Sequence, residues 1–241
     1  MKAVVLAAGD GGRLRPMTLW TPKVLLEVGG RPLIHYPLTA LREAGIADIA
    51  VVVGYQRTLV QEALAREFPD LTFLHNPRFH GGNALSVYAA RAFVGDDPFV
   101  VCMGDHPIST YIVTTLLQEP SEGCVLCVDR EPALSSQLDD ATRVLTDPQG
   151  RILEIGKGLP VWDAVDTGVF RLTTEVFPVI EELMGSHGDD VSLSQVVRRM
   201  GSSGRPLATC DVTGAFWADV DTLEDYNSVD ALLRERHGER V

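Results

Sequence analysis

The sequence lacks the long apolar run and the excess of basic residues that mark two large classes of protein. No stretch of its 241 residues approaches the roughly 18 uninterrupted apolar residues of a membrane-spanning helix, so we expect no membrane insertion. The formal net charge of -12 argues against a surface that neutralises the phosphates of a nucleic acid polymer. Residues 1–5 lead directly into an apolar strand instead of a signal peptide, which predicts a cytoplasmic location.

Cysteine is also scarce, and its four positions indicate neither a metal site nor a disulfide framework. Cys124 and Cys127 lie three residues apart in an apparent strand, where their side chains would point to opposite faces. Cys102 and Cys210 stand alone in apolar surroundings. We therefore expect four buried, reduced thiols.

Lysine occurs at only three positions, Lys2, Lys23 and Lys157, against 18 arginines. Lys23 ends a glycine-rich segment, and Lys157 precedes an Asp-Thr-Gly sequence at 166–168. A compact, strongly hydrated ammonium suits a phosphate that moves during a reaction, so both lysines are candidates for phosphate binding. For Lys157 the alternative is a chance position in an arginine-rich composition.

What the sequence does have is a glycine-rich loop directly after its first apolar strand. Gly9, Gly11 and Gly12 are free to adopt positive φ and leave backbone N–H groups open to an anion. Arg13 adds a planar fork for phosphate oxygens, and Lys23 adds a mobile point charge. The loop is therefore predicted to cradle a triphosphate.

Two commoner phosphate motifs do not fit this loop. A Walker loop needs four residues between its first glycine and a Gly-Lys-Ser/Thr sequence, and the chain has no such run. The dinucleotide fingerprint fails because Leu14 stands where its third glycine would be. The missing glycine weighs against a nicotinamide-dependent oxidoreductase.

Apolar and amphipathic segments alternate along the first half of the chain. We expect strands at 2–8, 48–54, 71–75 and 98–103, and helices at 33–44, 57–67, 83–94 and 109–118. This rhythm predicts an α/β fold with a Rossmann-like mixed, mainly parallel sheet and helices on both faces. Ligands on such sheets bind beyond the carboxyl ends of the strands, where Gly9 and Asp105 are expected.

The second half changes to a different order of elements. We expect strands at 123–129, 141–146, 151–156 and 164–171, helices at 173–184 and 191–200, strands at 206–211 and 214–220, and a terminal helix at 222–236. There is no linker or repeat, so residues 1–241 are predicted to form a single domain in which the second half adds a substrate lobe to the same sheet.

Aspartates at the ends of two expected strands provide ligands for a metal ion. Asp105 follows the strand at 98–103, and Asp219 and Asp221 share one face of the strand end at 214–220. Mg²⁺ commonly takes one or two carboxylates together with substrate phosphates and water. We therefore predict Mg²⁺ at Asp105 with Asp219, Asp221 or both. Thr222, Glu224 and Asp225 are explained as the start of the last helix.

The loop resembles the signature of the sugar-phosphate nucleotidyltransferases, Gly-x-Gly-x-Arg-x-x-Pro-x-Thr-x-x-x-Pro-Lys. The matching positions are Gly9, Gly11, Arg13, Pro16, Thr18, Pro22 and Lys23. Segments 81–88, 103–106, 155–158 and 165–168 narrow the resemblance to the inositol-1-phosphate cytidylyltransferases, over residues 1 to about 230. Asp219 falls on the aspartate of the family's Trp-x-Asp pattern.

The resemblance implies roles for particular residues. Those implied to bind nucleotide are Ala8, Gly9, Gly11, Gly12, Arg13, Lys23, Gly54, Gly82 and Asn83, in a half spanning about 1–118. Those implied to bind the acceptor are Lys157, Asp166 and Gly168, in a half spanning about 119–241. Arg13, Lys23, Asp105 and Lys157 are implied to act in catalysis. For Asn83, capping of the helix that follows it is a further role.

The implied reaction is attack by a phosphate oxygen of a cyclitol or sugar phosphate on the α-phosphorus of an NTP, with release of pyrophosphate. An ionised phosphate needs no general base, so His106 receives no such role. CTP and myo-inositol 1-phosphate are the implied substrates. Hexose 1-phosphates, valienol-type phosphates or phosphocholine, with UTP, dTTP, GTP, ATP or CTP, stay open, as does an inactive nucleotide-sensing subunit. The oligomeric state is not predicted.

Overall fold

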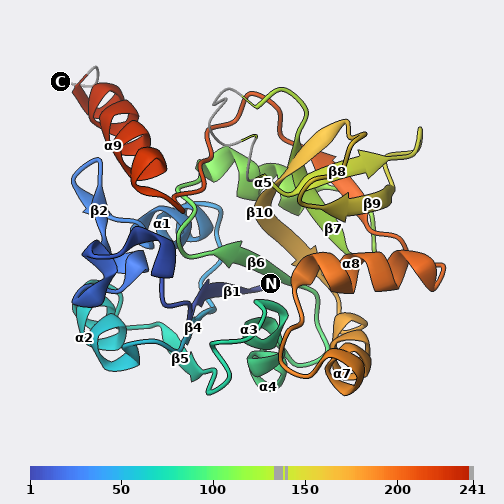
Figure 1. The fold of residues 1–241 in the computed structure, drawn as a ribbon, viewed down its shortest axis with the longest axis horizontal. Helices are drawn as coiled ribbons and strands as arrows, with labels where there is room; N and C mark the ends of the chain where they lie inside the picture. Colours follow the sequence, from blue (N-terminus) through green and yellow to red (C-terminus); the bar gives the residue numbers. More distant parts are fainter. Residues whose placement is uncertain (133–137, 139–140, 239–241) are drawn as a thin grey trace.

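The computed structural model describes residues 1–132, 138 and 141–238 (Figure 1). Its first half supplies β1 (Lys2–Ala7), β4 (Ile49–Val53), β5 (Thr72–His75) and β6 (Phe99–Met103). Its second half supplies β7 (Val125–Asp129), β8 (Arg143–Thr146), β9 (Ile152–Gly156), β10 (Ala164–Leu172) and β11 (Ala208–Asp211). Within the described residues these nine strands form one sheet in the order β11-β7-β10-β6-β1-β4-β5, with β8 beside β10 and β9 beside β8.

The direction of each strand decides which residues meet at the ligand edge of the sheet. β1 runs parallel to β4 and β6, whereas β10 runs antiparallel to β6 and β7. The start of β10 therefore lies at the same edge as the carboxyl ends of β1 and β6. Because Val169 pairs with Cys102, Asp166 extends beyond the last residues of β6.

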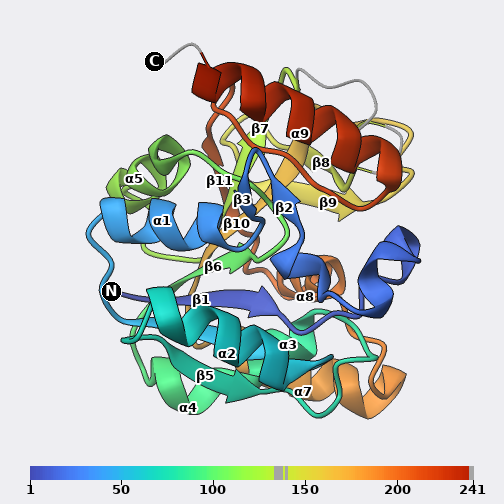
Figure 2. The same ribbon diagram turned by 90° about the vertical axis from the view of Figure 1, so that its left-hand side faces the viewer.

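Helices cover both faces of the sheet. One face carries α1 (His35–Glu43), α2 (Arg57–Glu67) and α5 (Thr110–Gln118). The other carries α3 (Ala84–Ala89), α4 (Arg91–Val94), α7 (Val176–His187) and α8 (Leu193–Ser202). Figure 2 shows α1 and α5 side by side. In the described part of the chain, no helix has both the length and the apolar character needed to cross a membrane.

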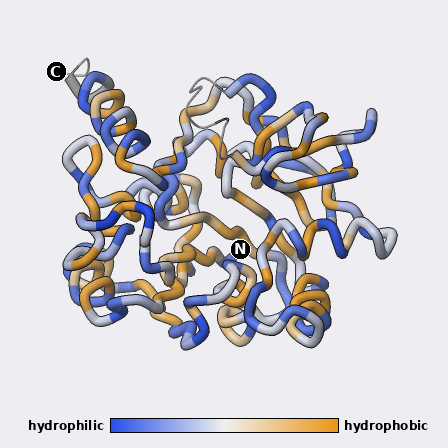
Figure 3. The backbone as a smooth tube through the Cα atoms, in the orientation of Figure 1, coloured by the Kyte–Doolittle hydropathy of each residue, from blue (hydrophilic) through white to orange (hydrophobic). Residues whose placement is uncertain are grey.

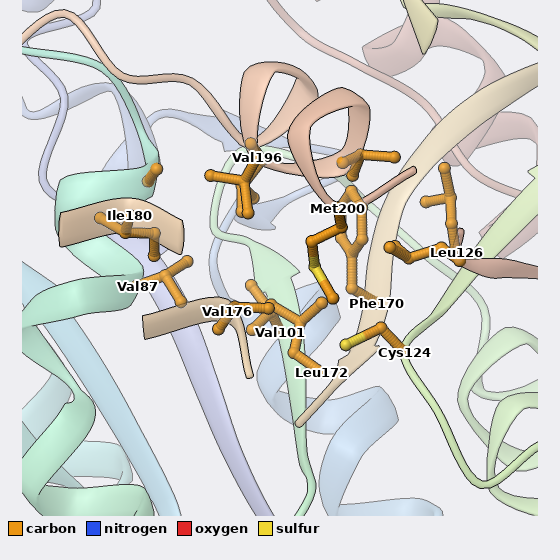
Figure 4. Packing of buried hydrophobic residues seen from close by; sticks show 14 of the residues in the cluster. Val87, Val101, Cys124, Leu126, Phe170, Leu172, Val176, Ile180, Val196 and Met200 are labelled. Atoms are coloured by element: carbon orange, nitrogen blue, oxygen red, sulfur yellow. The ribbon is translucent and has the colours of Figure 1, made fainter. Parts of the chain in front are cut away.

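Alternate strand residues supply two separate cores, as a sheet buried on both faces requires. Val4 and Leu6 of β1 belong to one core, and Ala3 and Val5 belong to the other. Figure 3 shows apolar residues concentrated along the central strands. Figure 4 shows part of the first core, where residues of β6 and β10 pack against α7 and α8.

A third, smaller core joins the C-terminal helix to a hairpin near the N-terminus. The hairpin consists of β2 (Glu27–Val28) and β3 (Arg31–Pro32), and the helix is α9 (Leu223–Gly238). Val28 and Leu33 pack with Val229 and Leu233. This packing holds α9 against the β2–β3 hairpin (Figure 1).

The expected fold class is confirmed, and the expected state of the cysteines is confirmed as well. Cys102, Cys124, Cys127 and Cys210 are all free and buried. Cys124 and Cys127 belong to different cores, so they face opposite sides of the sheet.

Two expected elements are wrong, and the β2–β3 hairpin was not predicted. Residues 214–220 form no strand: Gly214 has φ +83°, and only Trp217 makes a bridge, to Ile108. Burial of Trp217 and Val220 explains why this segment has the apolar pattern of a strand. The helix expected at 83–94 is divided at Ala90, whose ψ of -2° and N–H bond to Val87 form a turn between α3 and α4.

Candidate active site

The loop after β1 folds back on itself around Gly11. Gly11 has φ +61°, and a Cβ on it would lie 2.7 Å from Cβ of Lys23. Its carbonyl accepts a hydrogen bond of 2.9 Å from the Thr18 hydroxyl. The glycine thus allows the two ends of the loop to touch, which brings Lys23 beside the end of β1. Gly9 differs, because a Cβ there would meet no atom within 4 Å.

Lys23 lies between two carboxylates. Its Nζ donates to Asp105 Oδ2 at 2.6 Å and to Asp221 Oδ1 at 2.5 Å, and its side chain is only 8% exposed. Arg13 pairs with the other oxygen of Asp221. Burial opposes the charge of Lys23, but Asp105, Asp221 and Asp219 outweigh it and raise its pKa well above the ordinary value.

The residues at this point fit a magnesium ion. Asp105, Asp219 and Asp221 each offer an oxygen within 4.8 Å of the other two. Asp219 Oδ1 is buried and meets no hydrogen-bond partner of good geometry among the described residues, with His106 Nε2 3.3 Å away; a carboxylate oxygen accepts more than one contact, so it can also serve a cation. A set of carboxylate oxygens beside a phosphate-binding loop is the donor set that Mg²⁺ prefers.

His106 lies next to Asp219 and also lines the larger cavity described below. Its Nε2 lies 3.3 Å from Asp219 Oδ1, close enough for an ion pair, and its Nδ1 lies 3.1 Å from the carbonyl oxygen of Thr167. Burial opposes protonation of the ring, but Asp219 and Asp105 raise the pKa of His106 to about 10. Although burial also opposes the charge of Asp219, His106 holds the pKa of that carboxyl well below its usual range.

Gly168 makes room for the imidazole ring. It has φ +78°, and a Cβ there would lie 2.5 Å from Nδ1 of His106. Its N–H donates to Asp166 Oδ1 at 2.7 Å. Burial raises the pKa of Asp166 to about 6, against the opposing effects of this hydrogen bond and of His106. Gly168 thus contacts His106 and Asp166, and does not itself line the cavity described next.

Two cavities meet at the carboxylates. One, of about 540 Å³, is lined by Gly82, Asn83 and Ser86 near the start of α3 and by Lys157 and Asp166 of the second half. The second, of about 430 Å³, is lined by the loop of Gly9, Gly11, Gly12 and Arg13 and by Lys23. Both cavities are lined by Leu6, Gly9, Asp105 and Asp221. Ligands in the two spaces would therefore face each other across the aspartates.

Gly82 and Gly54, both expected to border the nucleotide base, differ in whether they line a cavity. Gly82 approaches the backbone closely, since a Cβ on it would lie 2.1 Å from the carbonyl oxygen of Val191. Gly54 lines neither cavity; a Cβ there would collide with Phe79 and with the carbonyl oxygen of Ala8. The structure therefore gives Gly54 a packing role behind the site.

Asn83 does not cap the helix that follows it. Its Oδ1 instead accepts a 2.8 Å hydrogen bond from the backbone N–H of Leu193, the first residue of α8. Asn83 thereby joins the cavity wall to a helix more than a hundred residues away. By contrast, Thr222 and Asp225 cap α9 reciprocally, as expected, through Thr222 N–H to Asp225 at 2.8 Å and Asp225 N–H to Thr222 at 3.2 Å. Both also line the larger cavity.

No role was predicted from the sequence for Asp129 or for Trp217. Trp217 lines the larger cavity, and its Nε1 donates to Asp129 Oδ2 at 2.8 Å. Asp129 is 3% exposed and ends β7. Asp105 was identified because it is an acidic residue at the end of an apolar strand, and the same pattern could have identified Asp129. Phe79 and Thr142, which also line this cavity, carry no comparable signal.

The backbone beside Trp217 joins the two acidic segments. The N–H of Ser109 donates to the carbonyl of Phe216 at 2.9 Å, and the N–H of Ala218 donates to the carbonyl of Pro107 at 3.0 Å. This short pairing follows Asp105 on one side and precedes Asp219 on the other. It fixes the aspartates opposite each other although no strand is present at 214–220.

Comparison with known proteins identifies a family for the chain. The family model described as "MobA-like NTP transferase domain" matches residues 3–202. The chain is 33% identical over 232 residues to the bifunctional IPC transferase and DIPP synthase of Aquifex aeolicus, covering 96% of this chain and 51% of the relative. It is 36% identical over 225 residues to the protein of that name from Rubrobacter xylanophilus, covering 92% and 50%. The chain thus spans about half the length of these curated relatives.

A solved structure matches the whole chain. It is the inositol-1-phosphate CTP transferase from T. maritima, with a TM-score of 0.86 and 28% identity, and the match covers 100% of this chain and 97% of that one. The central sheet, the glycine-rich loop after β1 and the family model together lead to one conclusion. The chain belongs to the family of MobA-like NTP transferase domains, among the sugar-phosphate nucleotidyltransferases.

Proposed function

We propose that this protein transfers CMP from CTP to myo-inositol 1-phosphate and releases pyrophosphate. The observation that supports this most is the meeting of two cavities at Asp105 and Asp221. A nucleotidyl transfer needs an acceptor phosphate and a triphosphate brought together beside a cation site. The T. maritima structure that matches the whole chain is that of an inositol-1-phosphate CTP transferase, which favours inositol phosphate and CTP as substrates.

The smaller cavity is proposed to hold the triphosphate. The backbone of Gly9, Gly11 and Gly12 faces this space, and Arg13 and Lys23 bring two cations to it. Backbone N–H groups and a guanidinium fork suit phosphate oxygens. Base and ribose would then extend into the larger cavity along Ala8, Gly82 and Asn83, with Gly54 supporting this wall from behind.

The acceptor is proposed to occupy the part of the larger cavity that is lined by Lys157 and Asp166. Lys157 would hold its phosphate, and Asp166 would accept hydrogen bonds from ring hydroxyls. Gly168 would act here through its N–H bond to Asp166, which fixes the direction of that carboxylate. Trp217, held by Asp129, supplies an apolar surface against which a cyclitol ring could pack.

The proposed reaction is an in-line displacement. A phosphate oxygen of the acceptor attacks the α-phosphorus, the bond to the bridging oxygen breaks, and pyrophosphate leaves with the negative charge. Asp105, Asp219 and Asp221 would hold Mg²⁺, which neutralises the charge that develops on the phosphates. Arg13 and Lys23 stabilise the departing pyrophosphate, and Lys157 orients the attacking group. The ionised acceptor phosphate gives up no proton, so no general base is required.

Other parts of the proposal come from the sequence. A cytoplasmic location, one domain over 1–241, and division into nucleotide and acceptor halves near residue 118 stay predictions.

The proposal is tested by pyrophosphate release with five NTPs, each combined with inositol, hexose and choline phosphates, with Asp105→Asn as the control of strongly reduced activity. CTP with myo-inositol 1-phosphate should give the highest kcat/KM. Cytosine and uracil differ in donor and acceptor positions, so an enclosed base site discriminates by up to ~10⁴-fold. A higher kcat/KM with another base or with a hexose phosphate would contradict the proposed substrate pair. Absence of turnover with every pair would favour a nucleotide-sensing subunit.

A further inference from the structure

Lys23 holds carboxylate oxygens that a metal ion would also use. Its ammonium lies 2.6 Å from Asp105 Oδ2 and 2.5 Å from Asp221 Oδ1. A Mg²⁺ ion bound to either oxygen, at about 2.1 Å, would lie within about 5 Å of the lysine nitrogen. The side chain of Lys23 is 8% exposed, so little water is present to screen the two positive charges. Lys23 and a metal ion therefore compete at this point.

Arg13 is tied to the same carboxylate. Its guanidinium pairs with Asp221 Oδ2 while Lys23 takes Oδ1. Both cations that the proposed function assigns to the triphosphate are thus paired with Asp221. A triphosphate has to replace Asp221 as their partner before it gains their full attraction.

We propose that Lys23, Arg13 and Asp221 exchange partners on binding, so that metal ion and triphosphate bind as a mutually dependent pair. The inference rests on the proposed function for the identity of the two ligands. When Asp105 and Asp221 turn to a metal ion, Lys23 and Arg13 are released for phosphate. When Lys23 and Arg13 turn to phosphate, the two carboxylates are released for the metal ion. Each ligand removes the competitor of the other, and by linkage the gain is reciprocal.

The exchange gives Asp221 a role different from that of Asp219. Asp221 is the counter-ion of the phosphate-binding cations, whereas Asp219 pairs with His106 and makes no hydrogen bond to Lys23 or Arg13 among the described residues. Removing the Asp221 carboxylate and removing the Asp219 carboxylate should therefore affect phosphate binding differently, although each change takes one negative charge from the same site.

The first test measures binding of Mn²⁺ alone, without nucleotide, by the electron paramagnetic resonance signal of free Mn²⁺. Lys23→Met should bind Mn²⁺ about tenfold or more tightly than the wild type, within the range usual for coupled sites. The control Lys2→Met removes a lysine whose Nζ contacts the carbonyl of Phe93 at 2.7 Å, at the far end of β1, and should bind Mn²⁺ as the wild type does. Equal or weaker Mn²⁺ binding by Lys23→Met would overturn the proposal.

The second test uses calorimetry to measure binding of inorganic tripolyphosphate in the presence of EDTA, which removes divalent metal ions. This test does not depend on Lys23→Met and therefore still applies if that variant does not fold. Asp221→Asn should gain about tenfold or more in affinity, and the matched control Asp219→Asn should gain clearly less. Equal gains in affinity for the two variants would mean that only the net charge of the site matters, and would overturn the proposed exchange of partners. Neither probe contains a base or a cyclitol. Failure of CTP and inositol phosphate as substrates, with both shifts observed, would therefore contradict only the proposed substrate pair.

Discussion

At the scale of single residues, Asp105 offers the most direct test of the proposed chemistry. Asp105→Asn keeps the size of the side chain but removes a charge that contacts Lys23 and borders both cavities. Loss of one strong charge-stabilising contact costs on the order of 10²-fold or more in kcat. The measurement is pyrophosphate release at saturating Mg²⁺, with Asp97→Asn, an exposed carboxylate, as the control. Full activity of Asp105→Asn would rule out its assignment.

Lys157 should act on the acceptor and not on the nucleotide. Lys157→Ala is expected to raise KM for inositol 1-phosphate by about tenfold or more, because it removes a contact that is present before the chemical step. Lys23→Ala should instead weaken use of the NTP. Calorimetry with each substrate separates the two effects; unchanged acceptor affinity together with a large loss of CTP affinity in Lys157→Ala would reverse the roles.

Asp166 predicts a pH dependence of stability. Its pKa is raised to about 6 in the folded protein, from 3.8, so the folded state holds its proton over a range where the unfolded state has lost it. The stabilisation is complete below about pH 4 and is lost as the pH rises through about 6. Asp166→Asn, which stays neutral, should gain ~1–3 kcal/mol in free energy of unfolding relative to the wild type between pH 4 and pH 7.

The measurement is urea unfolding at several pH values, with Asp97→Asn as a surface control. The difference between Asp166→Asn and wild type should grow with pH, whereas that for the control should stay flat. A constant difference for Asp166→Asn would mean that the carboxyl is already ionised at low pH in the folded protein.

At the scale of elements, the irregular part of β10 shapes the site. The pairing of β10 with β7 shifts register between Asp166 and Phe170, and Gly168 in this stretch has φ +78°. The irregularity lets one segment hold His106 and also present a carboxylate to the larger cavity.

Gly168→Ala should therefore harm both stability and turnover. An alanine there combines an unfavourable φ with a Cβ only 2.5 Å from His106 Nδ1, which predicts a loss of roughly 2–4 kcal/mol in free energy of unfolding. Gly204→Ala is a matched control, since it has the same φ of +78° and a Cβ there would meet nothing within 4 Å. Thermal unfolding and activity of the two variants are compared; equal losses would show that His106 does not depend on this space.

At the scale of the whole molecule, the sheet joins the two halves of the chain. β10 from the second half is hydrogen-bonded to β6 from the first half and to β7. The backbone pairing of residues 107–109 with 216–218 adds a second connection close to the site. Neither half completes the site without the other, because Asp105 comes from one half and Asp219 and Asp221 come from the other.

We expect the two halves to unfold together in a single cooperative transition. Urea unfolding followed by far-ultraviolet circular dichroism reports on the whole chain. The change in tryptophan fluorescence reports largely on Trp162 and Trp217 of the second half, because Trp20 of the first half is already 84% exposed in the folded protein. The two curves should coincide. Separate transitions would contradict the prediction of one domain over residues 1–241.

Several features followed from the sequence by itself because they depend on neighbours along the chain. The order of the main strands and helices came from periodicity, which reflects burial on one or two faces. The loop from Gly9 to Lys23 was identified from fixed spacing, and Asp105 from its place at the end of an apolar strand. Lys157 was identified from the scarcity of lysine and from resemblance, and Asp166 from resemblance alone; the larger cavity does bring the two together.

Other features depended on contacts between distant segments, which local patterns do not contain. The segment at 214–220 has the apolar alternation of a strand, yet its partner is a loop and not the sheet. Asn83 was expected to cap its own helix, but α8 lies close enough to take its oxygen. The pairing of Lys23 and Arg13 with Asp221 joins residues about two hundred positions apart. The sequence by itself therefore determined which charged residues the chain carries and which of them belong to a motif. Only the tertiary packing decided which of these charges pair with one another.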